Sequence, residues 1–141
     1  KKVIEGLTRQ PKSSSKEDVI ENNLMTRRLW ASPKYPTSEE ILRENFSYRY
    51  DRMYYPDGST RQYAAIGDDG DRTLRLQKIS LPTLILHGSS DNLVPLEAGK
   101  DTYRNISGSN IEILDGWGHD LPEGVHDWIV DKIHNHIKSC I

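Results

Sequence analysis

The stretch from Leu81 to Gly88, LPTLILHG, constrains the fold more than any other part of this chain. A short, continuous apolar run that ends in glycine is typical of a strand buried on both faces. The pattern predicts that a helix over residues 96–106 and a second strand over 110–114 follow it. A last helix, residues 122–138, carries an apolar stripe of valine and isoleucine. Strand, helix, strand, helix is a parallel βαβα unit, which assigns the chain to the α/β class.

The part of the chain before this unit has a different, helical pattern. Serines before the first helix and Thr37 or Ser38 before the second are suitable N-caps. Helices are predicted over residues 18–30, from 39 to either 50 or 54, and over 60–66, with a turn at 56–58 and a loop at 67–71. We therefore divide the chain into a helical cap or lid region, residues 1–78, and a core segment, residues 79–141.

Two strands are too few to make a stable parallel sheet. A central strand as apolar as residues 84–86 needs a neighbour on each side and helices on both faces. The sequence therefore requires strands that these 141 residues do not contain. We expect the chain to be a C-terminal fragment of a larger α/β core, whose N-terminal half comes from the same protein or from a partner chain.

Composition and charge argue against several classes of partner. The net charge is −2 and lysine and arginine are dispersed, so no basic field attracts nucleic acid or anionic lipid. The arginines at 27–28 and 49–52 are interpreted as solvated surface charge. No apolar run approaches the roughly 18 residues of a membrane span. The single cysteine, Cys140, cannot form an internal disulfide, which favours a reducing compartment and a cytoplasmic location.

Both predicted strands are followed by a titratable side chain in the loop at their carboxyl end. Asp91 follows the first strand and His119 the second, and chemistry in open α/β sheets lies at such ends. Adjacent loops allow the two to meet as part of a nucleophile–histidine–acid relay, in which the carboxylate orients the imidazole. Glycines beside His119 let the backbone turn tightly and keep the imidazole reachable. Asp91 also fits an ordinary turn residue, since Ser-Ser-Asp-Asn suits a turn.

The two loops resemble the C-terminal signature of the α/β-hydrolase family. The similar segments are LPTLILHGSSDNLVP at residues 81–95 and DGWGHD at 115–120. The resemblance implies that Asp91 is the acid and His119 the base of a catalytic triad, and it covers residues 79 to 141. The preceding region is similar only in general character to the helical cap of that family. GWGHDLP at 116–122 also resembles a subgroup of aclacinomycin methylesterase-like proteins.

The family's nucleophile lies on a Gly-x-Ser-x-Gly turn, and no such motif occurs in this chain. The family order is nucleophile, acid, histidine, so we expect the nucleophile and the oxyanion hole upstream of Lys1 and the chain alone to be inactive. The resemblance implies a serine hydrolase acting on a small, fairly apolar ester, without metal or organic cofactor. Alternatives are dehalogenases and epoxide hydrolases with an aspartate nucleophile, C–C bond hydrolases, and a non-catalytic hydrolase-like binding module.

Other residues have two possible interpretations. Trp117 is a candidate substrate-binding residue, with packing as the alternative. His87 ends the first strand and is predicted to be packed or hydrogen-bonded in the core. Asp127, Asp131 and His134 share a helix face, which we interpret as solvated rather than as a metal site. The aromatic residues between 46 and 63 either shape an apolar pocket or pack within the cap.

Overall fold

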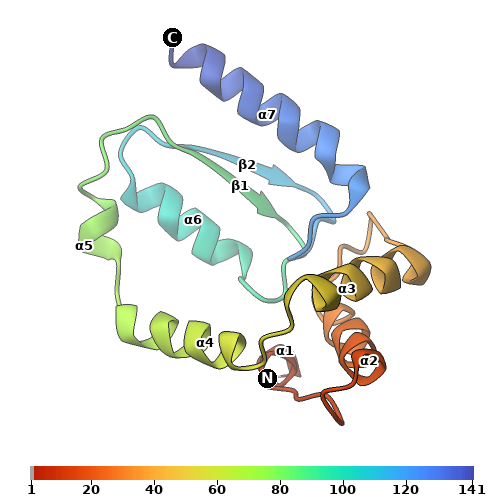
Figure 1. Cartoon of the computed structure of the whole chain (residues 1–141). Helices are drawn as coiled ribbons and strands as arrows, with labels where there is room; N and C mark the ends of the chain where they lie inside the picture. Colours follow the sequence, from red (N-terminus) through yellow and green to blue (C-terminus); the bar gives the residue numbers. More distant parts are fainter. Residues whose placement is uncertain (1) are drawn as a thin grey trace.

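The computed structural model describes residues 2–141, with side chains from Glu5 onward. Within that range helices surround a two-stranded parallel sheet (Figure 1). In chain order the elements are α1 (Lys2–Leu7), α2 (Lys16–Arg27), α3 (Glu39–Met53), α4 (Asp57–Asp69), α5 (Thr73–Leu76), β1 (Leu84–Gly88), α6 (Leu96–Asn105), β2 (Asn110–Leu114), the 3-10 turn η1 (Glu123–Val125) and α7 (His126–Ser139).

The helices α2 and α3 form a packed pair whose N-termini are capped by serine, as the sequence predicts. The Ser15 hydroxyl accepts a hydrogen bond from the amide of Asp18, and the Ser38 hydroxyl accepts one from the amide of Ile41, both at 3.3 Å. Each cap satisfies one of the amides that have no partner inside the helix. The buried face of α2 is apolar and consists of Val19, Ile20 and Leu24.

The prediction for residues 56–71 was partly wrong, because α4 is longer than expected. It begins directly after Pro56, in the stretch predicted to be a turn. Proline suits a helix start, since the amide that it lacks would have no partner there. The helix ends at Asp69, and the next residue, Gly70, has a φ of +61°, in the left-handed region that favours glycine. The short helices α1 and α5 were not predicted.

The sheet confirms the predicted α/β class and the βαβα order. β1 and β2 pair in parallel, with Leu84 opposite Asn110 and Gly88 opposite Leu114. The connecting helix α6 contacts both strands, and α7 contacts β1. Figure 1 shows the strands between these two helices, with their carboxyl ends directed towards the α2–α3 pair. The candidate site lies at this end of the sheet.

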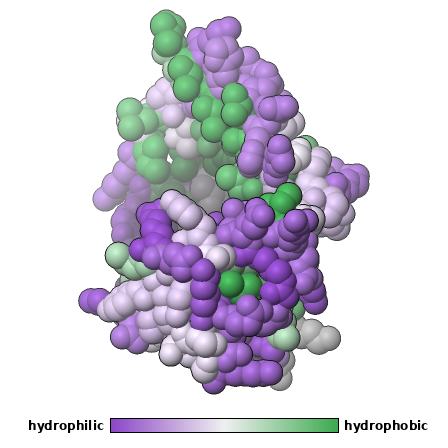
Figure 2. All heavy atoms as spheres, turned by 45° about the vertical axis from the view of Figure 1, so that its right-hand side comes forward, coloured by the Kyte–Doolittle hydropathy of each residue, from purple (hydrophilic) through white to green (hydrophobic). Residues whose placement is uncertain are grey.

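Apolar side chains of the sheet and of α7 are less buried than the sequence predicts. Residues 84–87 of β1 are half-buried, since the sheet of the described chain has only two strands. On α7, Val130, Ile133 and Ile137 are exposed. Figure 2 shows apolar atoms gathered in the upper part of the molecule, where Figure 1 places α7. None of the helices described is both long and apolar enough to cross a membrane.

We expect Leu24→Ala to lower the free energy of unfolding by about 2–5 kcal/mol, because the substitution leaves a cavity beneath α2. Leu24 is 3% exposed, whereas its neighbour Met25 is 42% exposed and serves as the matched control. Urea denaturation followed by circular dichroism measures both variants. Equal losses in the two would contradict the packing of α2 described above.

Candidate active site

The loops that leave the carboxyl ends of β1 and β2 are joined by backbone and side-chain hydrogen bonds. The amide of Ser89 donates to the carbonyl of Leu114 at 3.0 Å, and the amide of Ser90 donates to the carbonyl of Trp117 at 2.9 Å. In the other direction, the amide of Gly116 donates to the Ser89 hydroxyl at 2.8 Å. The two loops therefore hold a defined position relative to each other.

Asp91 and His119 meet across these loops. Nδ1 of His119 donates to Oδ2 of Asp91 at 2.7 Å. The second oxygen, Oδ1, accepts from the amides of Leu93 and Val94 at 2.9 and 2.8 Å. The Asp91 side chain is 6% exposed and the His119 side chain 43% exposed. The carboxylate is thus fixed by three hydrogen bonds in a buried position, while the imidazole stays accessible.

This geometry can orient a histidine as a general base. When Nδ1 donates to a carboxylate, the neutral imidazole keeps its lone pair on Nε2, which is then free to accept a proton. Nε2 of His119 has no hydrogen-bond partner among residues 2–141. A carboxylate placed in this way also stabilises the imidazolium that forms after proton transfer.

Glycines permit the close backbone contacts around the two loops. A Cβ atom on Gly88 would lie 2.1 Å from the carbonyl oxygen of Trp117, and one on Gly118 would lie 2.4 Å from that of Trp30. Gly116 has a φ of +75°, which turns the chain after β2. The approach at Gly118 lets the amide of His119 donate to the Trp30 carbonyl at 2.8 Å. The glycines of this motif therefore allow the histidine loop to pack against the segment after α2.

Asp120, the residue after the histidine, anchors this loop to α2. Its carboxylate is 2% exposed and accepts from Nη2 of Arg27 at 2.5 Å and from the Ser32 hydroxyl. The Ser32 oxygen in turn accepts from the amide of Gly118 at 2.9 Å. Arg27 was interpreted as solvated surface charge, and this was wrong: its side chain is only 19% exposed. Burial lowers the pKa of Arg27, while the negative charge of Asp120 partly offsets this effect.

Sequence reasoning did not identify Arg27, Ser32 or Asp120 as part of the site. The first two lie about 90 residues before Asp120 in the chain, so no local pattern connects them to it. The only signal in the sequence was the carboxylate of Asp120 directly after His119, because a carboxylate that is buried there requires a partner.

Trp117 and His87 both make packing contacts. The indole Nε1 of Trp117 donates to the carbonyl of Asp120 at 2.5 Å, and its ring meets that of Trp128 edge-on at 6.0 Å. Trp117 also lines the cavity described below, so its role in binding substrate stays a prediction. The His87 ring lies against α6, where a Cβ on Gly99 would be 2.5 Å from it. Nδ1 of His87 donates to the carbonyl of Gly88 at 2.9 Å, in agreement with a packed residue.

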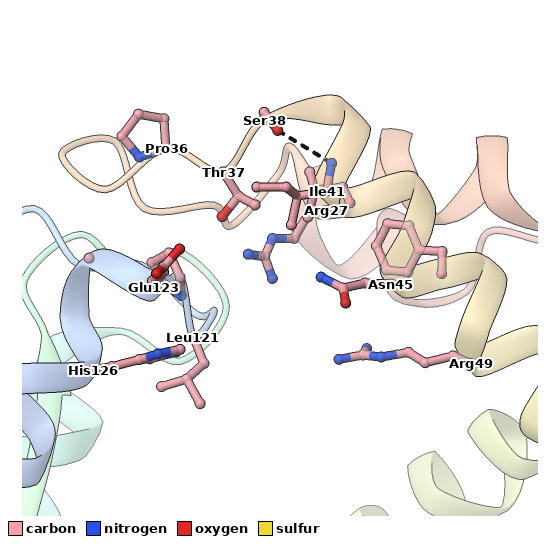
Figure 3. A pocket seen from close by; sticks show the side chains of 14 residues that line it. Arg27, Pro36, Thr37, Ser38, Ile41, Asn45, Arg49, Leu121, Glu123 and His126 are labelled. Carbon is pink, nitrogen blue, oxygen red and sulfur yellow. Dashed lines mark hydrogen bonds between the residues drawn. The ribbon is translucent and has the colours of Figure 1, made fainter.

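Two adjoining cavities open at this end of the sheet. One, of about 560 Å³, is lined by Asp91, His119 and Trp117. The other, of about 690 Å³, lies between α3 and residues 121–126 (Figure 3). They share a part of their lining, consisting of Arg27, Arg49 and Leu121. No group of three or more histidine, cysteine, aspartate or glutamate side chains in the described chain is placed to hold a metal ion.

Comparison with known proteins places the chain in a family. Residues 25–124, which include Asp91 and His119, match the model of a family described as serine aminopeptidase, S33. The chain belongs to this family of the α/β-hydrolase superfamily. Over 64 residues the chain is 33% identical to an uncharacterized hydrolase of Bacillus subtilis (strain 168), YugF. The aligned part is 45% of this chain and 23% of that protein, so the chain spans about a quarter of the relative's length.

We expect Asp120→Asn to lower the free energy of unfolding by about 3 kcal/mol, at the lower end of the range for breaking a buried ion pair. The loss arises because Arg27 keeps its charge in a half-buried position without a carboxylate. Asp115→Asn is the matched control in the same loop, since its ion pair with Lys34 is exposed. Urea denaturation compares the two variants. Equal effects would show that Asp120 is not an anchor.

We also expect the contribution of Asp115 to stability to depend on pH. Hydrogen bonds from Lys34 and then from Ser89 lower the pKa of Asp115 below its ordinary value of 3.8. The unfolded chain therefore takes up this proton at a higher pH than the folded chain does. The stabilisation is fully present when the pH is above the ordinary pKa of the carboxyl group. It is lost as the pH falls through the lowered pKa of Asp115 in the folded chain. The difference in unfolding free energy between the parent chain and Asp115→Asn should vanish on acidification, and a difference independent of pH would contradict this.

Proposed function

We propose that this hydrolase is a serine carboxylic-ester hydrolase in which His119 is the general base and Asp91 the acid that orients it. The observation that supports the proposal is the 2.7 Å hydrogen bond between Nδ1 of His119 and Oδ2 of Asp91 at the carboxyl ends of two parallel strands. The proposed nucleophile is a serine outside these 141 residues, because no Gly-x-Ser-x-Gly turn occurs within them. It belongs to the same protein or to a partner chain.

In the proposed reaction the serine oxygen attacks the ester carbonyl carbon while its proton passes to Nε2 of His119. The imidazolium is stabilised by Asp91 and gives the proton to the departing alcohol oxygen as the C–O bond breaks. Water then attacks the acyl-enzyme by the same route, which releases the carboxylic acid and restores the serine. No step requires a metal ion or an organic cofactor.

The cavity beside His119 suggests a small, largely apolar acyl group. Leu86, Val94 and Leu121 line it together with Trp117. Binding sites for small molecules are mostly apolar, with a few placed polar groups. The family description names an aminopeptidase, so amide hydrolysis by the same relay is a second candidate function.

We further propose that additional strands of an α/β core cover the apolar surface left open here. The support is physical: β1 and β2 have no other strand partner among residues 2–141, and α7 exposes Val130, Ile133 and Ile137. Exposed apolar surface of this kind marks a site of association. The proposed partner is the part of the hydrolase that carries the nucleophile.

The test is hydrolysis of 4-nitrophenyl butanoate by the full-length protein that contains this chain. We expect His119→Ala to lower kcat by about six orders of magnitude and Asp91→Asn by about four. Arg104→Ala, an exposed arginine on α6, is the control and should leave kcat unchanged. Aminoacyl 4-nitroanilides test the second candidate, and a fluorophosphonate probe should label the proposed serine.

Three outcomes would overturn the proposal. Turnover by the 141-residue chain that His119→Ala abolishes would place the nucleophile within it. Hydrolysis without fluorophosphonate labelling would favour an aspartate nucleophile, as in dehalogenases and epoxide hydrolases. Absence of both turnover and labelling in the full-length protein would favour a binding module.

A further inference from the structure

The larger cleft, between α3 and residues 121–126, adjoins the cavity that His119 lines. The two share Arg27, Arg49 and Leu121 as lining residues. A molecule whose scissile bond lies at Nε2 of His119, and that is long enough to pass these shared residues, would enter this cleft. At about 690 Å³ its volume is within the usual range for binding sites of small molecules.

One wall of the cleft presents hydrogen-bond donors. Figure 3 shows the side chains of Arg27, Asn45 and Arg49 directed into the cleft from α2 and α3. Asn45 and Arg49 are one helical turn apart, so they lie on the same face of α3. On the same wall Ile41, Leu42 and Phe46 provide apolar surface.

Arg49 differs from Arg27, Arg28 and Arg43 in having no ion pair within the described residues. Arg52 of α3 shares this property but lies outside the cleft lining. Arg27 is paired with Asp120, Arg28 with Glu39, and Arg43 with three glutamates. Arg49 has no ion-pair partner among the residues described, and its guanidinium lies 6.0 Å from the centre of the Phe46 ring. Arg27 and Arg49 line the same two cavities, and the positive charge of Arg49 also acts to lower the pKa of Arg27.

The opposite wall consists of the segment around η1. Figure 3 shows Leu121, Glu123 and His126 on this side, facing the donors across the cleft. Glu123 has no ion-pair partner in the described part of the chain and lines the cleft at the η1 end. A ligand that lies between the two walls therefore meets a guanidinium on α3 and a single carboxylate across from it.

We propose that the cleft binds a carboxylate group of the substrate, with Arg49 and Asn45 as its ligands. A guanidinium matches a carboxylate with two parallel N–H donors, and the amide nitrogen of Asn45 adds another donor. The preferred substrate is then a small ester that carries a carboxylate at the end remote from the scissile bond. Arg49 is its specificity-determining residue. This inference rests on the proposed function for the position of the scissile bond.

The kinetic test compares two esters that differ in one terminal group, mono-4-nitrophenyl glutarate and 4-nitrophenyl pentanoate. In the full-length protein Arg49→Ala should lower kcat/KM for the glutarate ester about 10- to 100-fold, the effect of losing a charge-assisted hydrogen bond. For the pentanoate ester it should stay within about twofold. Arg49→Lys should retain part of the preference for the glutarate ester, because lysine keeps the positive charge but lacks the two parallel N–H donors of the guanidinium. Arg52→Ala, on the same helix and outside the cleft lining, is the matched control.

Glu123→Gln separates ligand binding from an internal ion pair. If Arg49 binds a substrate carboxylate, removal of the opposing negative charge should raise kcat/KM for the glutarate ester. If Arg49 and Glu123 instead pair with each other and hold the two walls of the cleft together, Arg49→Ala and Glu123→Gln should each lower kcat/KM. The loss should then be the same for both esters. That result would overturn the inference.

A binding measurement makes the outcome independent of catalysis. Glutarate is titrated into the full-length His119→Ala variant while the side-chain N–H signals of Arg49 and Asn45 are followed by NMR. Saturable shifts that disappear in the double variant with Arg49→Ala support the carboxylate site, even where neither ester is hydrolysed and the proposed function fails. Absence of saturable shifts would overturn the inference whatever the esterase assay shows.

Discussion

The buried carboxylate of Asp120 is the contact on which the arrangement of the site depends. A charge removed from water is costly unless it is paired and hydrogen-bonded, and Asp120 obtains its partners from Arg27 and Ser32. Both partners come from α2 or from the segment that follows it. The loop after β2 therefore has to lie against this segment, and the amide of His119 meets the carbonyl of Trp30 as a result.

The same contact fixes the position of His119, the proposed base, relative to the face of α3 that carries Arg49. α2 packs against α3, and Arg43 of α3 joins Glu17 and Glu21 of α2 in ion pairs. Because α2 is tied to the histidine loop, the face of α3 that carries Arg49 has a defined position relative to His119. Substrate recognition and proton transfer would then depend on one anchor, and a change at the anchor would affect both.

Sequence patterns predicted the parts of this fold that local chemistry determines. Serine caps and an apolar run ending in glycine indicate where helices and strands begin and end, and parallel strand order brings Asp91 and His119 to the same edge. The stretch from Pro56 was misjudged because proline and aspartate favour both a turn and a helix start, and only the surrounding structure decides between them. The pairing of Arg27 with Asp120 follows from packing between distant segments, which no local pattern reports.

Asp91 and His119, the proposed acid and base, are held in place by nearby residues of this chain. Asp91 is fixed by the two amides that follow it in its own loop, and His119 by Asp91 and by the Trp30 carbonyl. A relay whose groups are oriented before the substrate arrives avoids the cost of ordering them during the reaction. The proposed serine would then only have to meet Nε2, the imidazole nitrogen that is not bonded to Asp91. A half-exposed imidazole on a hydrogen-bonded loop suits that requirement, because it is accessible at the surface while Asp91 already sets its orientation.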